Sequence, residues 1–352
     1  MNFPKVFIII LNWNGLQDTL ECLESVYKLD YTNFHVIVVD NGSTDNSVTV
    51  IRETYPEVII IENIDNLGYT GGNNIAMSYA MHNGADYMWL LNNDTIVEKD
   101  TLGKLVDKAE KNIEVGLISP ILYYYDQPDR IQYCGSYIDW KNKTIVYPEE
   151  RNLNISEDFK TGRNVCLCGT ALLIKREVIE KIGYLDEKFF AYWEDTDYST
   201  RVLKEGFRNI ICTSSRIYHK APVINPASIR RGSHYFYYMS RNRYLWATKD
   251  LNRLKKMSYL RKYLSLVILT VMYYSESNEF ETANAYLDGM WAAFCGKSGP
   301  FDGTVLMPII LKKLFYLMSS WHPYMWANLF ECKCSYIILE SFRRFKLRMI
   351  ER

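Results

Sequence analysis

The chain has 352 residues, enough for a large domain with an appendage, and 48% of them are hydrophobic, which suffices for a sizeable core. Charged residues make up 23%, which excludes a disordered composition, and the formal net charge of zero argues against a nucleic-acid-binding protein. The charge is unevenly distributed, because residues 251–352 carry 14 Lys and Arg against eight Asp and Glu.

The cysteine pattern and the start of the chain bear on location. The eight cysteines include no CxxC pair, so reduced thiols are expected rather than a zinc site. The apolar run that begins at Val6 is too short to span a bilayer, and no cleavage site follows it. A cytoplasmic protein without a signal peptide is expected.

Strands and helices alternate four times in the first hundred residues. Apolar runs predict buried strands, and the spacing of Leu16, Leu20 and Leu23 predicts a helix after the first strand. The turn NGSTDNS is expected to open a second helix with Ser43 or Thr44 as its cap. The run NLGYTGGNN is expected to be a glycine-rich turn before a third helix. The predicted strands cover residues 6–11, 34–40, 58–63 and 87–94.

This alternation predicts an α/β fold with a mainly parallel, doubly wound central sheet. In such sheets ligands bind beyond the carboxyl ends of the strands. The predicted strands end in polar groups, which we expect to converge on one crevice: Asn12, Asp40, Asn66, Asn93 and Asp94.

The rest of the chain divides into two parts. Residues 115–220 mix short strands with turns, and a helix is expected from about Thr196 to Glu205, ended by Gly206. From about residue 225, long apolar helices are expected. The apolar run 264–274 is too short to span a membrane. Helices packed on the preceding α/β domain and peripheral docking on an anionic membrane surface are both compatible with this part.

Two strand-end aspartates have alternative interpretations. Asp40 is either a turn residue or an acceptor for the imide N–H of uracil or thymine, with Trp13 flanking the base. Asp94 either supplies a bend or coordinates Mg²⁺ or Mn²⁺ bound to a diphosphate.

The run FFAYWEDTDYS is either a surface helix with an acidic first turn or a site for an acceptor, a substrate whose hydroxyl group loses its proton. In the second case Asp195 is a general base kept ionised near a helix N-terminus, and Glu194 orients the acceptor. Three aromatic residues precede this pair and could form an acceptor platform: Phe190, Tyr192 and Trp193.

Two further basic groups also have a structural and a functional interpretation. His219 is either structural or able to reach a metal or diphosphate. Arg241, followed by Asn242, is either part of a helix surface or a phosphate ligand.

Seven runs follow one another along the chain: VFIIILNWNG, VIVVDNGSTDNS, NLGYTGGNN, LLNNDT, GTALLIKREVIEKIGYLDEKFFAYWEDTDYSTR, YHK and YYMSRN. In this order they resemble glycosyltransferase family 2 over about residues 5–245. The likeness is strongest to its rhamnosyltransferase-like subgroup, which builds bacterial surface and cell-wall polysaccharide. It implies a GT-A catalytic domain at 1–225, with a nucleotide-sugar half at 1–113 and an acceptor half at 114–225. A helical region at 226–352 would follow it.

The resemblance implies an inverting, metal-dependent transfer of one sugar, rhamnose or a similar hexose, from a dTDP- or UDP-sugar. The acceptor would be a glycan or a lipid-linked glycan. Asp195 would be the catalytic base, and Asp94 and His219 would hold the metal. The donor-contacting residues would be Trp13, Asp40, Asn66, Gly71, Gly72, Asn73, Asn93 and Arg241. The acceptor-contacting residues would be Gly169, Thr170, Trp193 and Glu194.

Two departures and two alternatives accompany this interpretation. The metal motif reads Asn92-Asn93-Asp94, which predicts a weaker, more phosphate-dependent metal site. The absence of a QxxRW run favours single-sugar addition over polymerisation. A sugar nucleotidyltransferase would need a basic loop where NWNGLQDT stands. A non-catalytic nucleotide- or glycan-binding module would not need the three aspartates.

Overall fold

The computed structural model describes residues 3–148, 162–220 and 232–319. The chain divides into two compact units, residues 1–229 and 230–352, and each is described by itself. The predicted boundary between residues 225 and 226 lies outside the described residues.

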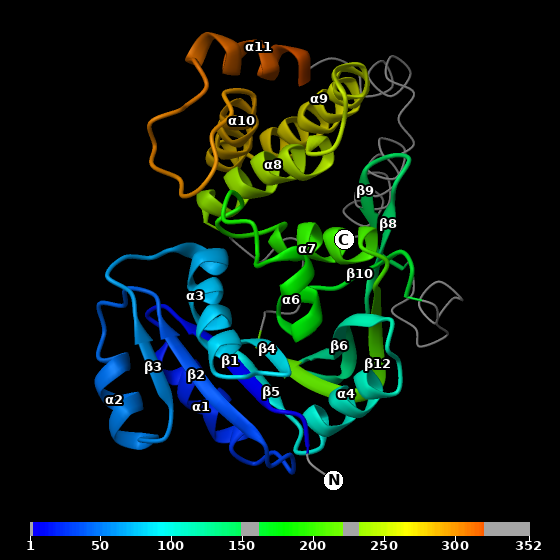
Figure 1. The fold of residues 1–352 in the computed structure, drawn as a ribbon. Helices are drawn as coiled ribbons and strands as arrows, with labels where there is room; N and C mark the ends of the chain where they lie inside the picture. Colours follow the sequence, from blue (N-terminus) through cyan, green and yellow to red (C-terminus); the bar gives the residue numbers. More distant parts are fainter. Residues whose placement is uncertain (1–2, 149–161, 221–231, 320–352) are drawn as a thin grey trace. The chain divides into compact units, whose positions relative to one another are not determined.

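A twisted mixed sheet forms the centre of unit 1 (Figure 1). Its strand order is β3-β2-β1-β4-β11-β6-β12-β5, with β7 paired to β6. The pairs among β3, β2, β1 and β4 and the pair β6–β12 are parallel, whereas β11 runs antiparallel to both of its neighbours. The predicted mainly parallel α/β sheet is therefore confirmed. The strands are β1 (Val6–Asn12), β2 (Phe34–Asp40), β3 (Ile59–Glu62), β4 (Tyr87–Asn92), β5 (Thr95–Val97), β6 (Val115–Tyr124), β7 (Gln127–Tyr133), β11 (Ala171–Lys175) and β12 (Arg208–His219).

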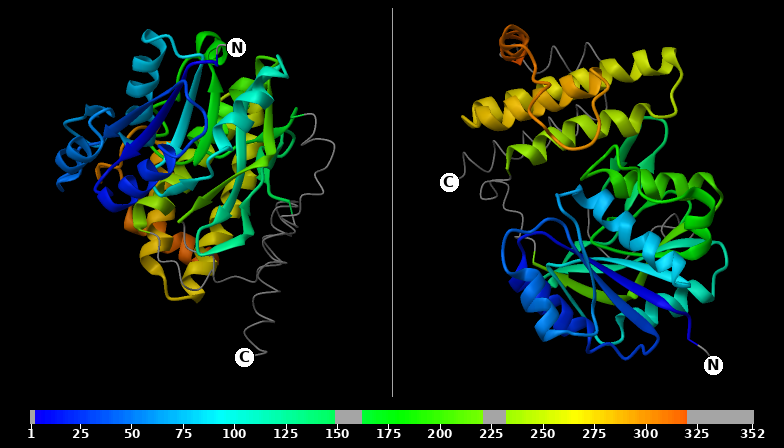
Figure 2. Two further views of the ribbon diagram at one scale, coloured as in Figure 1. Left: turned by 90° about the horizontal axis from the view of Figure 1, so that it is seen from below. Right: turned by 60° about the vertical axis from the view of Figure 1, so that its left-hand side comes forward.

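Helices cover both faces of this sheet, because alternate residues of each buried strand point to opposite sides. Ile8 and Ile10 pack in one core with residues of α1, α2 and α4, and Phe7 and Ile9 pack in another with residues of α3, α6 and α7. The views in Figure 2 show this layering from two further directions. The helices are α1 (Leu16–Val26), α2 (Ser47–Thr54), α3 (Gly68–His82), α4 (Thr101–Glu110), α6 (Arg176–Ile182) and α7 (Glu194–Lys204). A small antiparallel sheet joins β10 (Val165–Cys166), β8 (Ser136–Asp139) and β9 (Thr144–Val146).

Two local predictions were wrong. The glycine-rich run is not a turn before a helix, because α3 already begins at Gly68 and includes the other glycines of the run. Helix α2 is preceded by Asn46, without a side-chain cap, rather than by Ser43 or Thr44. Both hydroxyl residues instead bind the turn after β1, through Asn14.

The described part of unit 2, residues 232–319, is helical, as the sequence predicts. Its described helices are α8 (Ser233–Thr248), α9 (Arg253–Glu276), α10 (Phe280–Phe294) and α11 (Ile309–Ser319). The apolar run 264–274 is the central part of α9, and its buried side chains pack within the unit. Among the described residues, no helix has the length and apolar character needed to cross a bilayer.

Candidate active site

The ends of β1 and β2 are joined by buried hydrogen bonds. The Asn12 amide nitrogen Nδ2 donates to Asp40 Oδ1 at 2.9 Å, and the backbone N–H of Ser43 donates to Asp40 Oδ2 at 3.0 Å. Both oxygens of this buried carboxylate therefore have protein partners. The structure gives Asp40 the turn role that the sequence left open, and its contact with a base stays a prediction.

Asn41 connects the end of β2 to the start of α3. Its Nδ2 donates to Asn66 Oδ1 at 3.0 Å and to the Gly68 carbonyl at 3.1 Å. Its Oδ1 accepts from the Leu67 backbone N–H at 3.1 Å, and Asn66 Oδ1 accepts from the Gly68 backbone N–H at 2.8 Å. Asn41 was not predicted as a site residue, although it directly follows Asp40.

The next three predicted donor residues lie inside α3. A Cβ atom at Gly71 would lie 2.8 Å from Leu67 Cβ, and one at Gly72 would lie 2.4 Å from Leu11 Cδ1. Asn73 is buried and donates to the Tyr69 carbonyl at 2.8 Å. These residues allow close packing of the helix, and their contact with a donor stays a prediction.

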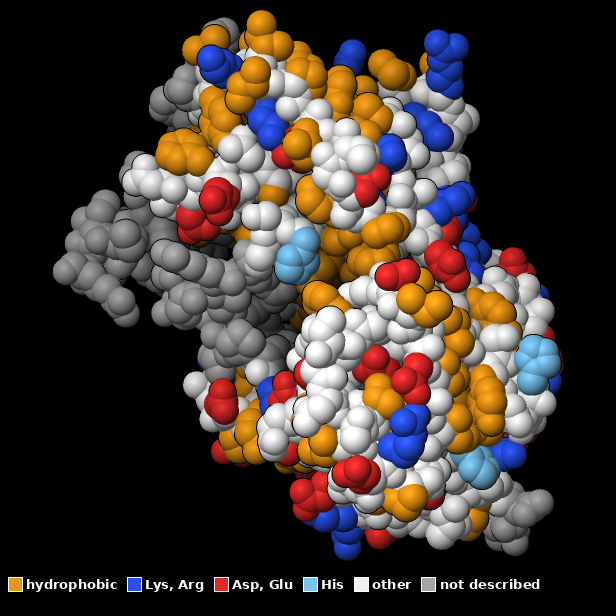
Figure 3. Space-filling model, turned by 90° about the vertical axis from the view of Figure 1, so that its left-hand side faces the viewer, with side chains coloured by type: hydrophobic (Ala, Val, Ile, Leu, Met, Phe, Trp, Pro, Cys, Tyr) orange, Lys and Arg blue, Asp and Glu red, His pale blue; other side chains and the backbone are white. Residues whose placement is uncertain are grey.

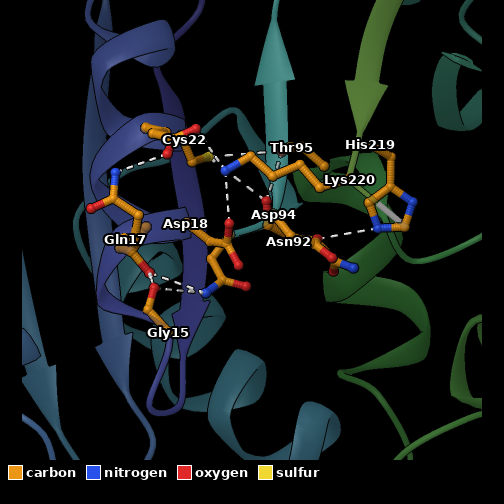
Figure 4. Close-up of polar contacts among 12 residues, drawn as sticks. Gly15, Gln17, Asp18, Cys22, Asn92, Asp94, Thr95, His219 and Lys220 are labelled. Atoms are coloured by element: carbon orange, nitrogen blue, oxygen red, sulfur yellow. Dashed lines mark hydrogen bonds and ion pairs between the residues drawn. The ribbon is translucent and has the colours of Figure 1, made fainter. Parts of the chain in front are cut away.

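Just beyond the end of β4, the Asp94 carboxylate faces the imidazole of His219 at the end of β12 (Figure 4). His219 Nε2 lies 3.1 Å from Asp94 Oδ1, and 34% of the Asp94 side chain is exposed. His219 Nδ1 lies 2.8 Å from Gln132 Oε1, so that this nitrogen donates to the amide oxygen and Nε2 faces Asp94. Burial works to raise the pKa of the Asp94 carboxyl, but the hydrogen bond and charge of His219 and the charge of Lys220 hold it below its usual range.

Lys220 fixes this strand end to α1. Its backbone N–H donates to the Asp94 carbonyl at 2.9 Å, and its Nζ lies 2.7 Å from both Asp18 Oδ1 and Glu21 Oε2 (Figure 4). Burial works to lower the pKa of Lys220, but hydrogen bonds to the two carboxylates raise it overall. The ammonium is therefore held as a charged bridge.

Asp94 and His219 fit a divalent cation site. Two ligand atoms of one metal with bonds of about 2.1 Å lie about 3.0 Å apart at a right angle, close to the 3.1 Å observed here. Gln132 supplies the outer hydrogen bond that orients a ligating histidine. Within the described residues, no group of three or more His, Cys, Asp or Glu side chains is placed to hold a metal. The remaining ligands would therefore come from phosphate and water.

Asp195 lies in the first turn of α7, partly buried. Its Oδ2 accepts the Gly169 backbone N–H at 3.0 Å, and its Oδ1 accepts the Thr196 backbone N–H at 2.6 Å. Burial raises the pKa of the Asp195 carboxyl, against the lowering effect of these hydrogen bonds. The helix terminus, which the sequence predicts, favours the charged form, whereas burial, which the sequence does not reveal, opposes it.

The neighbouring Glu194 is 6% exposed. Burial and then the charge of Asp195 raise its pKa well above the usual range. Within the described residues, its Oε2 is buried without a hydrogen-bond partner. Glu194 is therefore a carboxyl group that favours the neutral form, beside one that has the donors to remain charged.

The chain entering α7 has an unusual backbone. Phe190, Tyr192 and Trp193 have positive φ angles of 65°, 67° and 71°. Such conformations cost about 1–3 kcal/mol each in residues other than glycine. The Phe190 carbonyl is fixed by the Thr70 backbone N–H at 3.1 Å, so the start of α3 holds this segment in place. Strain of this kind is typical of functional sites.

A short segment links Asp195 to α3 and to the end of β4. The Tyr69 hydroxyl donates to the Gly169 carbonyl at 2.6 Å, and Gly169 N–H in turn binds Asp195. The carbonyl of the next residue, Thr170, accepts the Asn92 backbone N–H at 2.9 Å, two positions before Asp94. These contacts therefore bring the start of α7 with Asp195, the start of α3 and the end of β4 before Asp94 together.

Asn93 joins the same network to Asp40. Its Nδ2 donates to Thr19 Oγ1 at 3.1 Å, and Thr19 donates to Asn12 Oδ1 at 2.9 Å. Asn12 is the residue that binds Asp40, so this network joins the ends of β1, β2 and β4. That the predicted polar strand ends line one crevice stays a prediction. Trp13 is exposed beside them.

Arg241 does not fit its predicted role. It lies in α8 of unit 2, and its side chain is fully buried. Its guanidinium donates to the Gly299 carbonyl at 2.6 Å and packs over the rings of Tyr237 and Tyr238. Because these contacts occupy the guanidinium within its own unit, Arg241 is excluded from the donor site proposed below.

Sequence reasoning missed Gln132, Tyr69 and Lys220. Gln132 is 87 positions from His219, and no local pattern marks it. Tyr69 lies within the glycine-rich run, where an aromatic residue next to Gly68 was the available signal. Lys220 follows His219 directly, but its partners lie on the distant helix α1.

Solved structures share this fold. A mannosyltransferase of Pyrobaculum calidifontis, in complex with GDP-Man and Mn²⁺, aligns over 97% of this chain and 87% of its own, with a TM-score of 0.53 and 16% identity. TarS residues 1–349 of S. aureus, in complex with UDP-GlcNAc, align over 85% of this chain and 94% of their own, with a TM-score of 0.50 and 16% identity. The fold of unit 1 is the GT-A fold of glycosyltransferases.

Sequence relatives agree with the fold. An N-acetylglucosaminyl-diphospho-decaprenol L-rhamnosyltransferase of Mycobacterium tuberculosis is 28% identical over 52% of this chain and 66% of the relative. The chain spans only 24% of another relative, an uncharacterized protein of Sinorhizobium fredii, at 27% identity over 61% of this chain. The sequence model of glycosyl transferase family 2 matches residues 7–183, half of the chain. The chain therefore belongs to glycosyl transferase family 2.

Proposed function

We propose that this protein transfers a single sugar, with inversion, from a dTDP- or UDP-sugar to a glycan or lipid-linked glycan in bacterial surface polysaccharide synthesis. Rhamnose or a similar hexose is the proposed sugar, which the similarity to a rhamnosyltransferase supports. The observation that carries the proposal is the short segment 169–170. Its Gly169 N–H holds Asp195, and its Thr170 carbonyl binds the β4 end that leads to Asp94.

In this proposal Asp195 accepts the proton of the acceptor hydroxyl as that oxygen attacks the anomeric carbon opposite the diphosphate. Two backbone N–H groups orient the carboxylate, and burial moves its pKa toward the working pH, which strengthens it as a base. The diphosphate leaves from the opposite face, so the anomeric configuration inverts.

Three other groups would support the transfer. Asp94 and His219 would hold a Mg²⁺ or Mn²⁺ ion, which would supply neutralisation of the charge on the leaving diphosphate. Trp13, exposed at the end of β1, would flank the base. Glu194, with Trp193, would contact the acceptor sugar.

Asp195→Asn tests the assignment of the base. The variant should lose about 10²–10⁴-fold in transfer rate, because a general base contributes that much. Donor binding should stay nearly unchanged, since the amide preserves the shape of the side chain. Asp107→Asn makes the same chemical change at an exposed position of α4 and should be active. Full transfer by the Asp195 variant would refute the assignment.

A donor panel separates this proposal from its alternatives. Nucleotide release should be measured with UDP-, dTDP- and GDP-sugars in the presence of Mg²⁺ or Mn²⁺. A transferase hydrolyses one donor slowly without acceptor, whereas a binding module releases nothing. A nucleotidyltransferase would instead form a sugar nucleotide from a sugar phosphate and a nucleoside triphosphate.

A further inference from the structure

The first turns of α9 combine exposed apolar side chains with cations. Leu254 is 81% exposed and Met257 is 58% exposed. Exposed basic residues stand on both sides of them: Arg253, Lys255, Lys256 and Arg261. Apolar side chains of this exposure gain free energy only when a partner covers them.

The electrostatic potential at the first turns of α9 is positive and favours an anionic partner. A helix N-terminus already carries partial positive charge, so cations placed there raise the local potential further. In the described part of the chain, no carboxylate forms an ion pair with Arg253, Lys255, Lys256 or Arg261. This contrasts with Lys312, whose ammonium is paired with Asp288 at 2.8 Å inside the same unit.

Helix α11 adds a second apolar face to unit 2. Ile309 is 70% exposed and Ile310 is 74% exposed, and the half-exposed Leu306 and Leu314 lie beside them in sequence. Lys313 is exposed directly before Leu314. Helix α11 packs on α9, and the right-hand view of Figure 2 shows α11 and the start of α9 toward opposite ends of the upper edge of unit 2 (compare Figure 1). Figure 3 shows hydrophobic side chains gathered there, with Lys and Arg among them.

The charge of each possible occupant can be compared with the positive charge of this surface. Residues 320–352 contain six Lys and Arg against three Asp and Glu, so this segment has the same sign as the surface. A second copy would bring the same cations face to face, which is unfavourable. A bilayer with anionic headgroups offers opposite charge to the cations and hydrocarbon to the apolar side chains.

We propose that α9 and α11 dock unit 2 on an anionic lipid surface, with Leu254, Met257, Leu306, Ile309, Ile310 and Leu314 entering the interface and the adjacent cations facing the headgroups. We call these apolar residues, together with the adjacent cations Arg253, Lys255, Lys256, Arg261 and Lys313, the docking surface. The proposal is independent of the transfer chemistry, because its residues lie outside the site of unit 1.

Vesicle co-sedimentation of the full chain tests the docking surface. Wild-type protein should bind vesicles of equal parts phosphatidylcholine and phosphatidylglycerol, and bind vesicles of phosphatidylcholine alone much more weakly. Leu254→Glu/Met257→Glu should weaken binding at least about tenfold, because two carboxylates replace apolar anchors. Lys255→Gln/Lys256→Gln should weaken it about 30-fold, from about fivefold for each charge removed near the membrane.

Ile64→Glu/Ile113→Glu is the matched control, since both isoleucines are even more exposed but lie in unit 1. It should bind vesicles like the wild type, and thermal melting should show that all variants fold. Absence of wild-type binding to anionic vesicles, or unchanged binding by both docking-surface variants, would overturn the proposal. A stable wild-type dimer that Leu254→Glu/Met257→Glu dissociates would also overturn the proposal, if neither the wild type nor this variant binds vesicles.

Discussion

Glu194 buries a carboxyl group beside a second carboxylate at the start of α7. Burial, followed by the charge of Asp195, raises its pKa well above the usual range. The folded protein therefore holds this proton more tightly than the unfolded chain does. Stability from this group is fully present below the unfolded pKa of 4.5, and it is lost as pH rises toward the folded pKa.

Glu194→Gln should remove this pH dependence, because glutamine is neutral at every pH and similar in shape. We expect the variant to gain stability relative to the wild type as pH rises from about 4.5, by up to about 1.4 kcal/mol per pH unit across the titration. Thermal melting of both proteins between acidic and mildly alkaline pH measures this difference. Glu53→Gln, at an exposed position of α2, should show no such trend. A constant difference across pH would mean that Glu194 is not a buried, proton-holding carboxyl.

At the scale of elements, the site depends on how closely α3 approaches the segment that enters α7. Gly68 begins α3 with a φ of +72°, and a Cβ atom there would lie 2.4 Å from the Phe190 backbone oxygen. The same oxygen accepts the Thr70 backbone N–H. The helix start and the strained segment therefore fit together only because residue 68 has no side chain.

Gly68→Ala should destabilise the protein by about 2–4 kcal/mol, from the cost of a positive φ and of overpacking against backbone. Transfer should fall as well, because the displaced segment leads into Asp195. Gly103→Ala is the matched control: it lies within α4, and its added Cβ would meet nothing within 4 Å. The control should leave activity unchanged and raise stability by about 0.5–1 kcal/mol. Equal melting of both variants would contradict the close packing of α3.

The elements also show how far the sequence predicts the site. Buried strands with polar ends are readable, because apolar runs and turn residues are local signals, and the convergence at Asn12, Asp40 and Asn93 follows from parallel strands. The start of α3 is not readable, since glycines weaken a helix unless packing requires them. The Gln132–His219 contact and the burial of Glu194 depend on tertiary structure, which no local pattern contains.

At the scale of the whole molecule, the net charge of zero hides two opposite charges. Residues 230–352 carry 19 Lys and Arg against nine Asp and Glu, and the whole chain has 41 of each, so residues 1–229 are acidic. An anionic membrane would attract the basic unit and repel the acidic one. This division is compatible with the proposed transfer to a lipid-linked acceptor and with the proposed docking of unit 2.

Transfer to a lipid-linked acceptor in anionic vesicles should therefore depend on the docking surface, whereas transfer to a short water-soluble acceptor should not. With the lipid-linked acceptor, Leu254→Glu/Met257→Glu should raise KM at least about tenfold and leave kcat nearly unchanged, because docking only concentrates enzyme and acceptor at one surface. Added salt should likewise raise the KM of the wild type for the lipid-linked acceptor, since salt screens the attraction between the cations and the headgroups. An equal loss with both acceptors would instead indicate damage to the transfer site, and no loss with either would separate docking from transfer.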